Sequence, residues 1–377
     1  MVSRPTARMA EGVTSFGADD WDACAGRDNP FVRHAFLTAL EDSGSATPEA
    51  GWQPVPLAID GADGRPVAVM PAYAKSHSQG EYVFDHGWAD AWHRAGGSYY
   101  PKLQIAVPFS PVPGPRLLMR DPAMAPLLLA AAETVVREHG LSSAHATFVE
   151  QAQVPLFEAA GWLIRTDRQF HWTNRGYAGF DDFLAALSSR KRKAIRKERA
   201  AAVDGLEIVR LTGAAIEERH WDAFWHFYQD TSARKWGRPY LTRSFFSLIG
   251  ERMAEDVLLV MALRDGRAIA GALNLIGADA LYGRYWGSIE EVPFLHFEIC
   301  YYQAIDIAIE RGLKRVEAGA QGEHKLSRGY EPVPTWSAHY IPNESFRRAV
   351  AGFLAREREA IAENIEDLGE YTPFKKG

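Results

Sequence analysis

Apolar residues occur in short runs along the chain, and at two places a pair of such runs is separated by Asp-Gly. The first pair is Asp63-Gly64 and the second is Asp265-Gly266, and an arginine follows in both. An Asp-Gly turn between two apolar runs is typical of a β-hairpin. The pattern therefore predicts one hairpin in each half of the chain.

The spacing of the remaining apolar residues predicts further elements. Helical spacing predicts helices over residues 31–40, 122–139, 155–160, 214–235, 242–254, 296–311 and 344–367. Alternating or short apolar runs predict strands over residues 52–70, 102–110, 144–149, 162–172, 257–263, 268–276, 281–287, 315–318 and 335–341. Both halves show the same order of elements, which indicates a duplicated α+β domain. Each copy should have a mixed, mainly antiparallel sheet with helices on both faces.

The stretch between the hairpin and the end of the following helix differs between the two copies. Gly64 and Gly140 are 76 residues apart, whereas Gly266 and Gly312 are 46 residues apart. The first copy thus holds 30 additional residues, which fall at about 75–102. Titratable and aromatic residues are dense in this insertion, so it is a candidate for function.

We expect three parts in the chain. They are a first domain at 20–175 that contains the insertion, a second domain at 176–345, and a C-terminal helix and tail at 346–377. A length of 377 residues suits two domains of about 150 residues each. With 47% hydrophobic and 24% charged residues, the composition is that of an ordinary globular protein.

Composition also limits where the protein can act. The most apolar stretch, 124–136, contains Glu133 and is shorter than the about 20 residues of a membrane span. The N-terminal residues lack the apolar core of a secretory signal. Cys24 and Cys300 cannot form a disulfide framework and favour a reducing compartment. We expect a cytoplasmic protein, and peripheral contact with the inner membrane is compatible with these features.

Four short runs carry a resemblance to a known family. They are Gly80-Glu81-Tyr82-Val83-Phe84-Asp85, Tyr99-Tyr100-Pro101-Lys102-Leu103, Pro108-Phe109-Ser110-Pro111-Val112 and Gly319-Ala320-Gln321-Gly322-Glu323-His324-Lys325. With these runs the chain resembles the FemAB-like predicted N-acyltransferases of proteobacteria, which carry tandem Gcn5-related N-acyltransferase domains. The resemblance implies acyl transfer to an amine. Some bacterial ceramide-forming enzymes share the superfamily, so a lipid amine such as a sphingoid base, and a role in lipid metabolism, are open.

The insertion opens with the first candidate site, at residues 75–86. Removing a proton from an attacking amine needs a base with a pKa near neutrality, and His77 and Glu81 are the candidates. The neighbouring side chains that could bind substrate are Lys75, Tyr82, Asp85, His86 and Lys102. The alternative is a solvated polar loop. The 30 additional residues and the family resemblance favour a site.

A second candidate site lies at residues 321–330. Here Glu323 or His324 would be the base, and Lys325 with Arg328 would hold an anionic group. The alternative is a surface loop whose charges are solvated. Two aromatic residues of the preceding strand, Tyr285 and Trp286, would line a cleft for an acyl chain or a lipid amine, unless they only pack in the core.

A strongly basic segment precedes the second domain. Seven of the ten residues from Arg190 to Arg199 are Lys or Arg, in a chain of net charge −6. On a helix this segment presents two neighbouring basic rows, which include Arg192, Arg196, Lys193 and Lys197. Such a patch suits an anionic donor such as coenzyme A, an acyl carrier protein or tRNA. The alternative is a solvated helix face.

One expected motif is absent. Small acetyltransferases of this superfamily hold the coenzyme A pyrophosphate on a glycine-rich turn at a helix N-terminus. The corresponding segment here, 287–294, has two acids, Glu290 and Glu291, and no glycine pair. Ordinary coenzyme A docking is therefore disfavoured, and the FemAB enzymes share this departure because they use aminoacyl-tRNA donors.

The sequence thus favours an N-acyltransferase that moves an acyl group from acyl-CoA or an acyl carrier protein to a primary amine, with no tightly bound cofactor or metal. The alternatives are a FemAB-type aminoacyl-tRNA-dependent transferase for a cell-wall precursor and a non-catalytic module that binds a headgroup. We further expect the rings of the insertion to be buried over a cleft between the domains. We also expect His77, Glu81, Glu323 and His324 to converge there.

Overall fold

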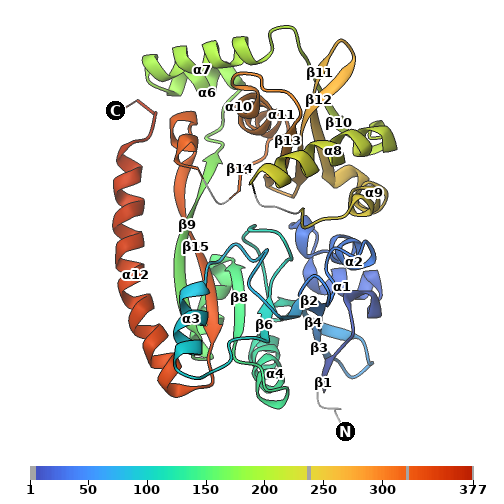
Figure 1. The fold of residues 1–377 in the computed structure, drawn as a ribbon, viewed down its shortest axis with the longest axis vertical. Coiled ribbons are helices and arrows are strands. Elements are labelled where there is room, and N and C mark those ends of the chain that lie inside the picture. Colours follow the sequence, from blue (N-terminus) through green and yellow to red (C-terminus); the bar gives the residue numbers. More distant parts are fainter. Residues whose placement is uncertain (1–5, 236–238, 320–321, 376–377) are drawn as a thin grey trace. The chain divides into compact units, whose positions relative to one another are not determined.

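The computed structural model describes residues 6–235, 239–319 and 322–375 (Figure 1). The chain divides into two compact units. Unit 1 comprises Met1–Asp167 and Pro334–Glu363, and unit 2 comprises Arg168–Val333 and Asn364–Gly377. Both units combine a mixed sheet with flanking helices, so the predicted α+β class is confirmed.

Unit 1 contains two sheets. The predicted first hairpin lies in a small antiparallel sheet of order β1-β3-β4-β7, formed by β1 (Thr6–Met9), β3 (Leu57–Asp60), β4 (Pro66–Met70) and β7 (Leu118–Met119). A second run of strands has the order β15-β8-β6-β5-β2. It is formed by β15 (Glu331–Tyr340), β8 (Ala144–Val149), β6 (Lys102–Ile105), β5 (Ala72–Lys75) and β2 (Trp52–Pro54). Within this run, β6 and β8 are parallel.

The helices of unit 1 cover these sheets with their apolar faces. They are α1 (Ala18–Ala25), α2 (His34–Asp42), α3 (His86–Arg94), α4 (Ala125–Glu138), α5 (Val154–Ala159) and the first part of α12 (Glu344–Glu370). In α4 one face is apolar, and its residues Leu128, Ala132 and Val136 recur at helical spacing and are fully buried. The chain leaves this helix through Gly140, whose φ of 63° is a conformation that glycine adopts without strain.

The insertion contains a helix, α3, which the sequence pattern did not predict. This helix packs on α12, where the rings of Trp92 and Phe346 stack with centroids 4.7 Å apart. Trp88 and Tyr99 are also buried. Phe84 is 61% exposed, so the expectation that every ring of the insertion is buried is wrong for this residue. That the insertion covers a cleft between the domains stays a prediction.

Unit 2 is built on strands in the order β10-β11-β12-β13-β14-β9. The strands are β10 (Glu207–Thr212), β11 (Val257–Arg264), β12 (Arg267–Ile276), β13 (Ala280–Ser288), β14 (Arg315–Glu317) and β9 (Leu163–Thr173). Only β13 and β14 are parallel, and the other neighbours in this order pair antiparallel. The predicted second hairpin is β11–β12. The edge strand β10 was not predicted.

The helices of unit 2 are α6 (Phe180–Ala186), α7 (Ser189–Ala202), α8 (Glu218–Lys235), α9 (Arg243–Arg252), α10 (Leu295–Phe297) and α11 (Gln303–Glu310). Helix α8 crosses β13 so closely that a Cβ at Gly287 would lie 2.2 Å from the carbonyl oxygen of Phe227. Only glycine fits there without a backbone shift.

The helix predicted over residues 296–311 is interrupted. Between α10 and α11 the chain forms one π-helical turn, Glu298–Tyr302. Such turns occur within helices and are frequent at functional sites. Among the described helices, none combines the length and the low polarity that crossing a membrane requires.

Candidate functional site

The parallel strands β13 and β14 of unit 2 pair over three residues only. Tyr282 pairs with Glu317, where β14 ends, whereas β13 continues to Ser288. Gly283 marks the last close approach, because a Cβ there would lie 3.6 Å from the Glu317 carbonyl oxygen. Beyond this point β13 has no β14 partner among the described residues.

A β-bulge in β13 lies at the same place. Leu273 of β12 pairs with Tyr285 and Asn274 pairs with Gly283, which leaves Arg284 as the extra residue. Bulges redirect side chains and are common beside active sites. A cavity of about 100 Å³ lies here. Its lining residues are Ala272, Leu273, Asn274, Gly283, Arg284, Tyr285, Trp286, His296, Cys300, Tyr301 and Ala318.

Tyr301 connects this cavity to the predicted base His324. The π-turn carries Tyr301 to the cavity wall, and its hydroxyl lies 2.9 Å from His324 Nε2. Burial raises the pKa of Tyr301 above its ordinary value, so the phenol is protonated at neutral pH. A protonated phenol that contacts an imidazole nitrogen can pass a proton from the cavity to that nitrogen.

Lys325 and Arg328 lie in the same 3-10 turn, Glu323–Arg328, and both are buried. Lys325 Nζ donates to the Gly319 carbonyl oxygen at 2.8 Å, and burial lowers the pKa of the Lys325 ammonium to about 7. Arg328 donates to Glu198 at 2.9 Å and lies over the Phe297 ring. The Arg328 guanidinium is thus fixed by Glu198 and the Phe297 ring, whereas the Lys325 ammonium is close to losing its charge at neutral pH.

Glu323, the other predicted base of this segment, begins the same 3-10 turn. Its side chain lies outside the described part of the structure.

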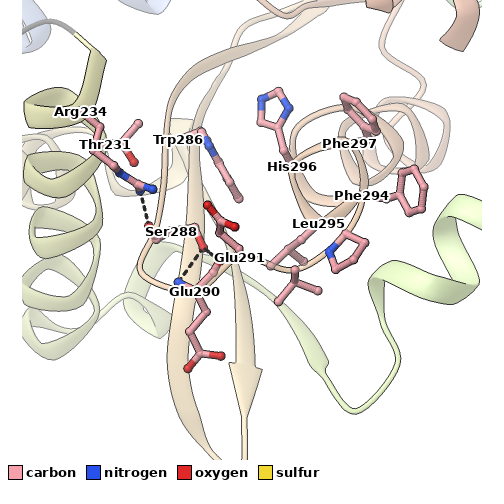
Figure 2. Close-up of a pocket in the computed structure, with 12 residues that line it drawn as sticks. Thr231, Arg234, Trp286, Ser288, Glu290, Glu291, Phe294, Leu295, His296 and Phe297 are labelled. Atoms are coloured by element: carbon pink, nitrogen blue, oxygen red, sulfur yellow. Dashed lines mark hydrogen bonds between the residues drawn. The ribbon is translucent and has the colours of Figure 1, made fainter.

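A larger cavity of about 540 Å³ adjoins the first and shares Trp286 and His296 with it. Figure 2 shows Trp286 between α8, which carries Thr231 and Arg234, and the helix that carries His296. The predicted cleft residues Tyr285 and Trp286 therefore both line cavities.

The acids Glu290 and Glu291 lie at the larger cavity. Glu290 pairs with Arg264 and with Arg267, so its charge is compensated. Glu291 is exposed, and Figure 2 shows it beside Trp286. A carboxylate at this position disfavours a pyrophosphate in the cavity.

The basic segment forms α7, as its composition suggested. Lys193, Arg196 and Lys197 are exposed, and Arg192 is half-buried. Arg196 makes an exposed ion pair with Asp181. In contrast, Arg199 is directed to the interior of unit 2, where it pairs with Glu298 and Asp306. Fewer than the seven basic residues of the segment are therefore available to bind an anionic partner.

In unit 1, the first candidate segment contributes to a buried ionic cluster. Lys75 of β5 pairs directly with Lys102 of β6, so two lysines face each other across neighbouring strands. Lys102 Nζ donates to Ser78 Oγ and to Glu81 Oε2, both at 2.8 Å, and it also contacts Asp85. The loop after β5 thus supplies the carboxylates that compensate the lysines. We call Lys75, Ser78, Glu81, Asp85 and Lys102 the Lys102 cluster.

The charges in the Lys102 cluster are shifted by burial and by one another. Burial raises the pKa of the Glu81 carboxyl to about 7, and burial lowers the pKa of the Lys75 ammonium to about 7. Burial opposes the charged form of Asp85, but the Lys102 ammonium and the hydrogen bonds from Lys102 and Ser78 act against it, and the pKa of Asp85 is lowered well below its usual range. Glu81 Oε1 and Asp85 Oδ1 are buried without a hydrogen-bond partner among the described residues.

Two histidines extend the Lys102 cluster, and sequence reasoning missed them. The Tyr99 hydroxyl donates to Asp85 at 2.7 Å and lies 3.3 Å from His145 Nε2. His145 Nδ1 lies 2.7 Å from His339 Nδ1, so one ring donates and the other accepts. Burial lowers the pKa of His145 to about 3, which keeps its ring neutral. The histidines lie on β8 and β15, and no local sequence signal links them.

The other predicted residues of the first segment have different surroundings. The His77 ring packs on Gly51, and its Nδ1 accepts from the Gln79 backbone amide at 3.2 Å. Tyr82 is half-buried with a φ of 59°, and His86 is exposed at the start of α3.

The structure therefore brings Lys75, Glu81, Asp85 and Lys102 together in unit 1. It also brings Tyr301, His324 and Lys325 to one region of unit 2. The convergence of His77 and Glu81 with Glu323 and His324 joins residues of both units and stays a prediction. Among the described residues, no group of three or more potential ligand side chains could hold a metal ion.

Comparison with protein families gives one match that covers nearly the whole chain. Residues 12–376 match the model of the FemAB-like family, which is described as peptidoglycan biosynthesis/recognition. No match was found among curated proteins.

Solved structures share the fold at low sequence identity. FemX is 14% identical with a TM-score of 0.56, and the match covers 89% of this chain and 98% of FemX. L-PGS from Bacillus licheniformis is 10% identical with a TM-score of 0.53, covering 88% of this chain and 98% of that one. The C-terminal domain of a putative lysylphosphatidylglycerol synthetase from Agrobacterium fabrum is also 10% identical, with a TM-score of 0.53 and coverage of 90% and 95%.

Proposed function

Because the chain belongs to the FemAB-like family, we propose that it is a transferase that joins an activated acyl group to a primary amine. In the form that we favour, the donor is an acyl-CoA or an acyl carrier protein thioester. A lipid amine, such as a sphingoid base, is the acceptor that suits an aromatic-lined cavity. The reaction would take place in unit 2, where β13 leaves β14.

The observation that carries this proposal is the contact between Tyr301 and His324. Tyr301 lines the cavity at the bulge of β13, and its hydroxyl is 2.9 Å from His324 Nε2. As the amine nitrogen attacks the carbonyl carbon, the amine proton moves to the Tyr301 oxygen while the tyrosine proton moves to His324. The new C–N bond forms as the C–S bond of the thioester breaks, and the leaving sulfur takes the proton back from the Tyr301–His324 relay, so that a thiol leaves and both residues return to their initial protonation states.

Acyl transfer requires hydrogen-bond donors for the negative charge that develops on the carbonyl oxygen. Direct transfer requires positioning, a base and these donors, and it requires no nucleophilic residue.

An aminoacyl-tRNA donor has equal support as a second candidate. The family match and the similarity to FemX favour it, and Glu291 disfavours a pyrophosphate at the larger cavity. The exposed cations Lys193, Arg196 and Lys197 of α7 suit either tRNA or the acidic surface of an acyl carrier protein. In this version the C–O bond of the aminoacyl ester breaks, and the ribose hydroxyl leaves.

The experiment compares donors and variants with one readout. The purified protein is incubated with acyl-CoA, acyl-loaded carrier protein or aminoacyl-tRNA and a panel of primary amines, and amide products are detected by mass spectrometry. Tyr301→Phe and His324→Ala should each lower turnover about 10²–10⁴-fold, the usual contribution of general acid–base catalysis. The double variant should be no slower than the slower single variant, because the two residues form one relay.

The neighbouring Tyr302→Phe is the matched control. Tyr302 contacts Glu198 and does not line either cavity, so its loss should leave turnover nearly unchanged. Wild-type turnover in both Tyr301→Phe and His324→Ala would show that the reaction takes place elsewhere. In that case the Lys102 cluster of unit 1 would be the next candidate for the base.

A further inference from the structure

Asn274 of β12 carries a buried hydrogen-bond acceptor in the wall of the smaller cavity at β13. The residue is 1% exposed, and its Oδ1 has no hydrogen-bond partner among the described residues. Its Nδ2 donates to the Ala272 carbonyl oxygen at 3.3 Å, and this hydrogen bond fixes which end of the amide carries the oxygen. A buried oxygen without a donor destabilises the folded protein. A ligand that donates a hydrogen bond to Oδ1 removes that cost.

Gly283 leaves the space in front of this oxygen open. Asn274 and Gly283 are paired residues of β12 and β13, and both line the cavity of about 100 Å³. A Cβ at Gly283 would lie 3.4 Å from Asn274 Oδ1. Because glycine has no Cβ, the oxygen can be reached from the cavity, and Tyr301 lines that same cavity. A group that contacts Tyr301 there is therefore also close to Asn274.

The charges in the lining favour a neutral ligand nitrogen. Arg284 carries a positive charge, and no carboxylate belongs to the lining among the described residues. Arg284 repels an ammonium, so the acceptor amine enters in its neutral form, whose lone pair can attack a carbonyl carbon. A cavity of this size accommodates the amino group only. The rest of the acceptor extends into the adjoining cavity of about 540 Å³, which shares Trp286 and His296 with the smaller one.

We propose, on the basis of the proposed transfer reaction, that Asn274 restricts the acceptor to primary amines. A primary amine has two N–H groups. One gives its proton to Tyr301, and the other donates to Asn274 Oδ1 and stays in the secondary amide that forms, so this hydrogen bond persists through the reaction. A secondary amine loses its single N–H proton to Tyr301 and leaves Asn274 without a donor, which disfavours it as a substrate.

Two product analogues test this hydrogen bond without a donor or turnover. N-Octylacetamide has one N–H and N-methyl-N-octylacetamide has none, and each is titrated into the full-length protein by calorimetry. The wild type should bind N-octylacetamide about tenfold more tightly, the usual scale of one hydrogen bond. Asn274→Leu keeps the branched shape without an acceptor, so it should lose this preference and bind the N-methyl compound as the wild type does. Asn274→Asp should retain the preference, because a buried carboxyl is protonated and keeps an acceptor oxygen.

Asn174→Leu is the matched control for stability. Asn174 lies outside the lining of both cavities; its side chain donates to the Leu313 carbonyl oxygen and accepts from two backbone amides. This variant should melt at a lower temperature than Asn274→Leu and still prefer N-octylacetamide. Gly283→Ala adds a methyl group at an ordinary contact distance from Asn274 Oδ1, so it should weaken N-octylacetamide binding about tenfold at an unchanged melting temperature.

The outcomes separate this proposal from the transfer reaction. Absence of N-octylacetamide binding, equal binding of the two amides by the wild type, or the same preference in Asn274→Leu would overturn the role of Asn274, even if the donor assay yields amides. The expected preference, together with no amide from any donor, would refute the transfer reaction and leave Asn274 as a residue that recognises an N–H group. Where amides form, Asn274→Leu should lower the kcat/KM ratio of octylamine to N-methyloctylamine about tenfold.

Discussion

Removing the Lys102 ammonium should strongly destabilise unit 1. Its Nζ donates to Ser78 and Glu81 at 2.8 Å and contacts Asp85, and the side chains of Lys102, Glu81 and Asp85 are 0%, 1% and 4% exposed. Lys102→Met keeps the length of the side chain but leaves the Asp85 carboxylate buried without the ammonium group that contacts it. Breaking a buried ion pair from one side costs about 3–5 kcal/mol of unfolding free energy.

The corresponding change in melting temperature is large enough to measure. A domain of this size loses roughly 2–4 °C per kcal/mol, so Lys102→Met should lower the melting temperature of unit 1 by roughly 6–20 °C. Differential scanning calorimetry measures this, with Lys193→Met as the control. Lys193 is exposed on α7, and its loss should change the unfolding free energy by no more than about 0.5 kcal/mol.

The pH dependence separates an electrostatic cause from a packing cause. Without Lys102, burial raises the pKa of Asp85 and of Glu81, so the folded variant binds more protons than the unfolded chain. Its stability should therefore fall as pH rises above about 4, and the deficit relative to the wild type should be smaller at pH 4 than at pH 8.

A neutral version of the Lys102 cluster provides the second control. Glu81→Gln and Asp85→Asn, added to Lys102→Met, remove the uncompensated charges and should recover part of the stability. The electrostatic account would be refuted if Lys102→Met lost no more unfolding free energy than Lys193→Met. It would also be refuted if the loss for Lys102→Met were the same at pH 4 and at pH 8.

Three further outcomes follow from other parts of the structure. Burial lowers the pKa of Lys325 to about 7, so between pH 7 and 10.5 the unfolded chain binds more protons than the folded protein. The unfolding free energy should therefore rise with pH in this range. Lys325→Met should remove about 2 kcal/mol of that rise between pH 7 and 9, as measured by denaturant titrations. Gly287→Ala would place a Cβ 2.2 Å from the Phe227 carbonyl oxygen and should lower the unfolding free energy by about 1–3 kcal/mol. Arg192→Glu with Arg196→Glu should weaken binding of the anionic donor in fluorescence titrations at low salt and leave the melting temperature unchanged.

Each of these outcomes has a result that contradicts it. For Lys325, the contradicting result is an unfolding free energy that rises equally with pH in Lys325→Met and in the wild type. For Gly287, the matched substitution is Gly179→Ala, where a Cβ meets nothing within 4 Å; equal stability of the two variants would show that α8 can move away from β13. For α7, unchanged donor affinity at low salt would assign the basic residues to solubility.

The local pattern of apolar and polar residues was sufficient to predict most of the helices and strands. The strand predicted at 144–149 matches β8, and the helix predicted at 122–139 contains α4 and ends before Gly140. Both hairpins were predicted because Asp-Gly turns are specified by the few residues that form them. The tandem α+β architecture followed from the repeated order of these elements. The family resemblance rested on four short runs, and the match over residues 12–376 confirms it.

The sequence pattern did not predict elements whose formation depends on contacts with distant parts of the chain. Helix α3 is short, and its residues are ordered by the stack of Trp92 on Phe346, more than 250 residues away in sequence. The π-turn within the helix predicted at 296–311 has no sequence signal of its own. Its effect is to bring Tyr301 to the cavity wall beside His324, which a regular helical spacing does not foretell.

Sequence by itself determined which side chains could act, and the tertiary structure decided which of them meet. Lys102, Glu81 and Asp85 were all singled out by residue type, yet their common burial follows from the pairing of β5 with β6. His145 meets them through Tyr99, and His339, 194 residues from His145, joins through His145 because β8 and β15 are neighbours in the sheet. Alternation along a strand specifies which residues face the interior but not which strand lies beside it. That choice is made by long-range packing, and it sets the electrostatics of the Lys102 cluster.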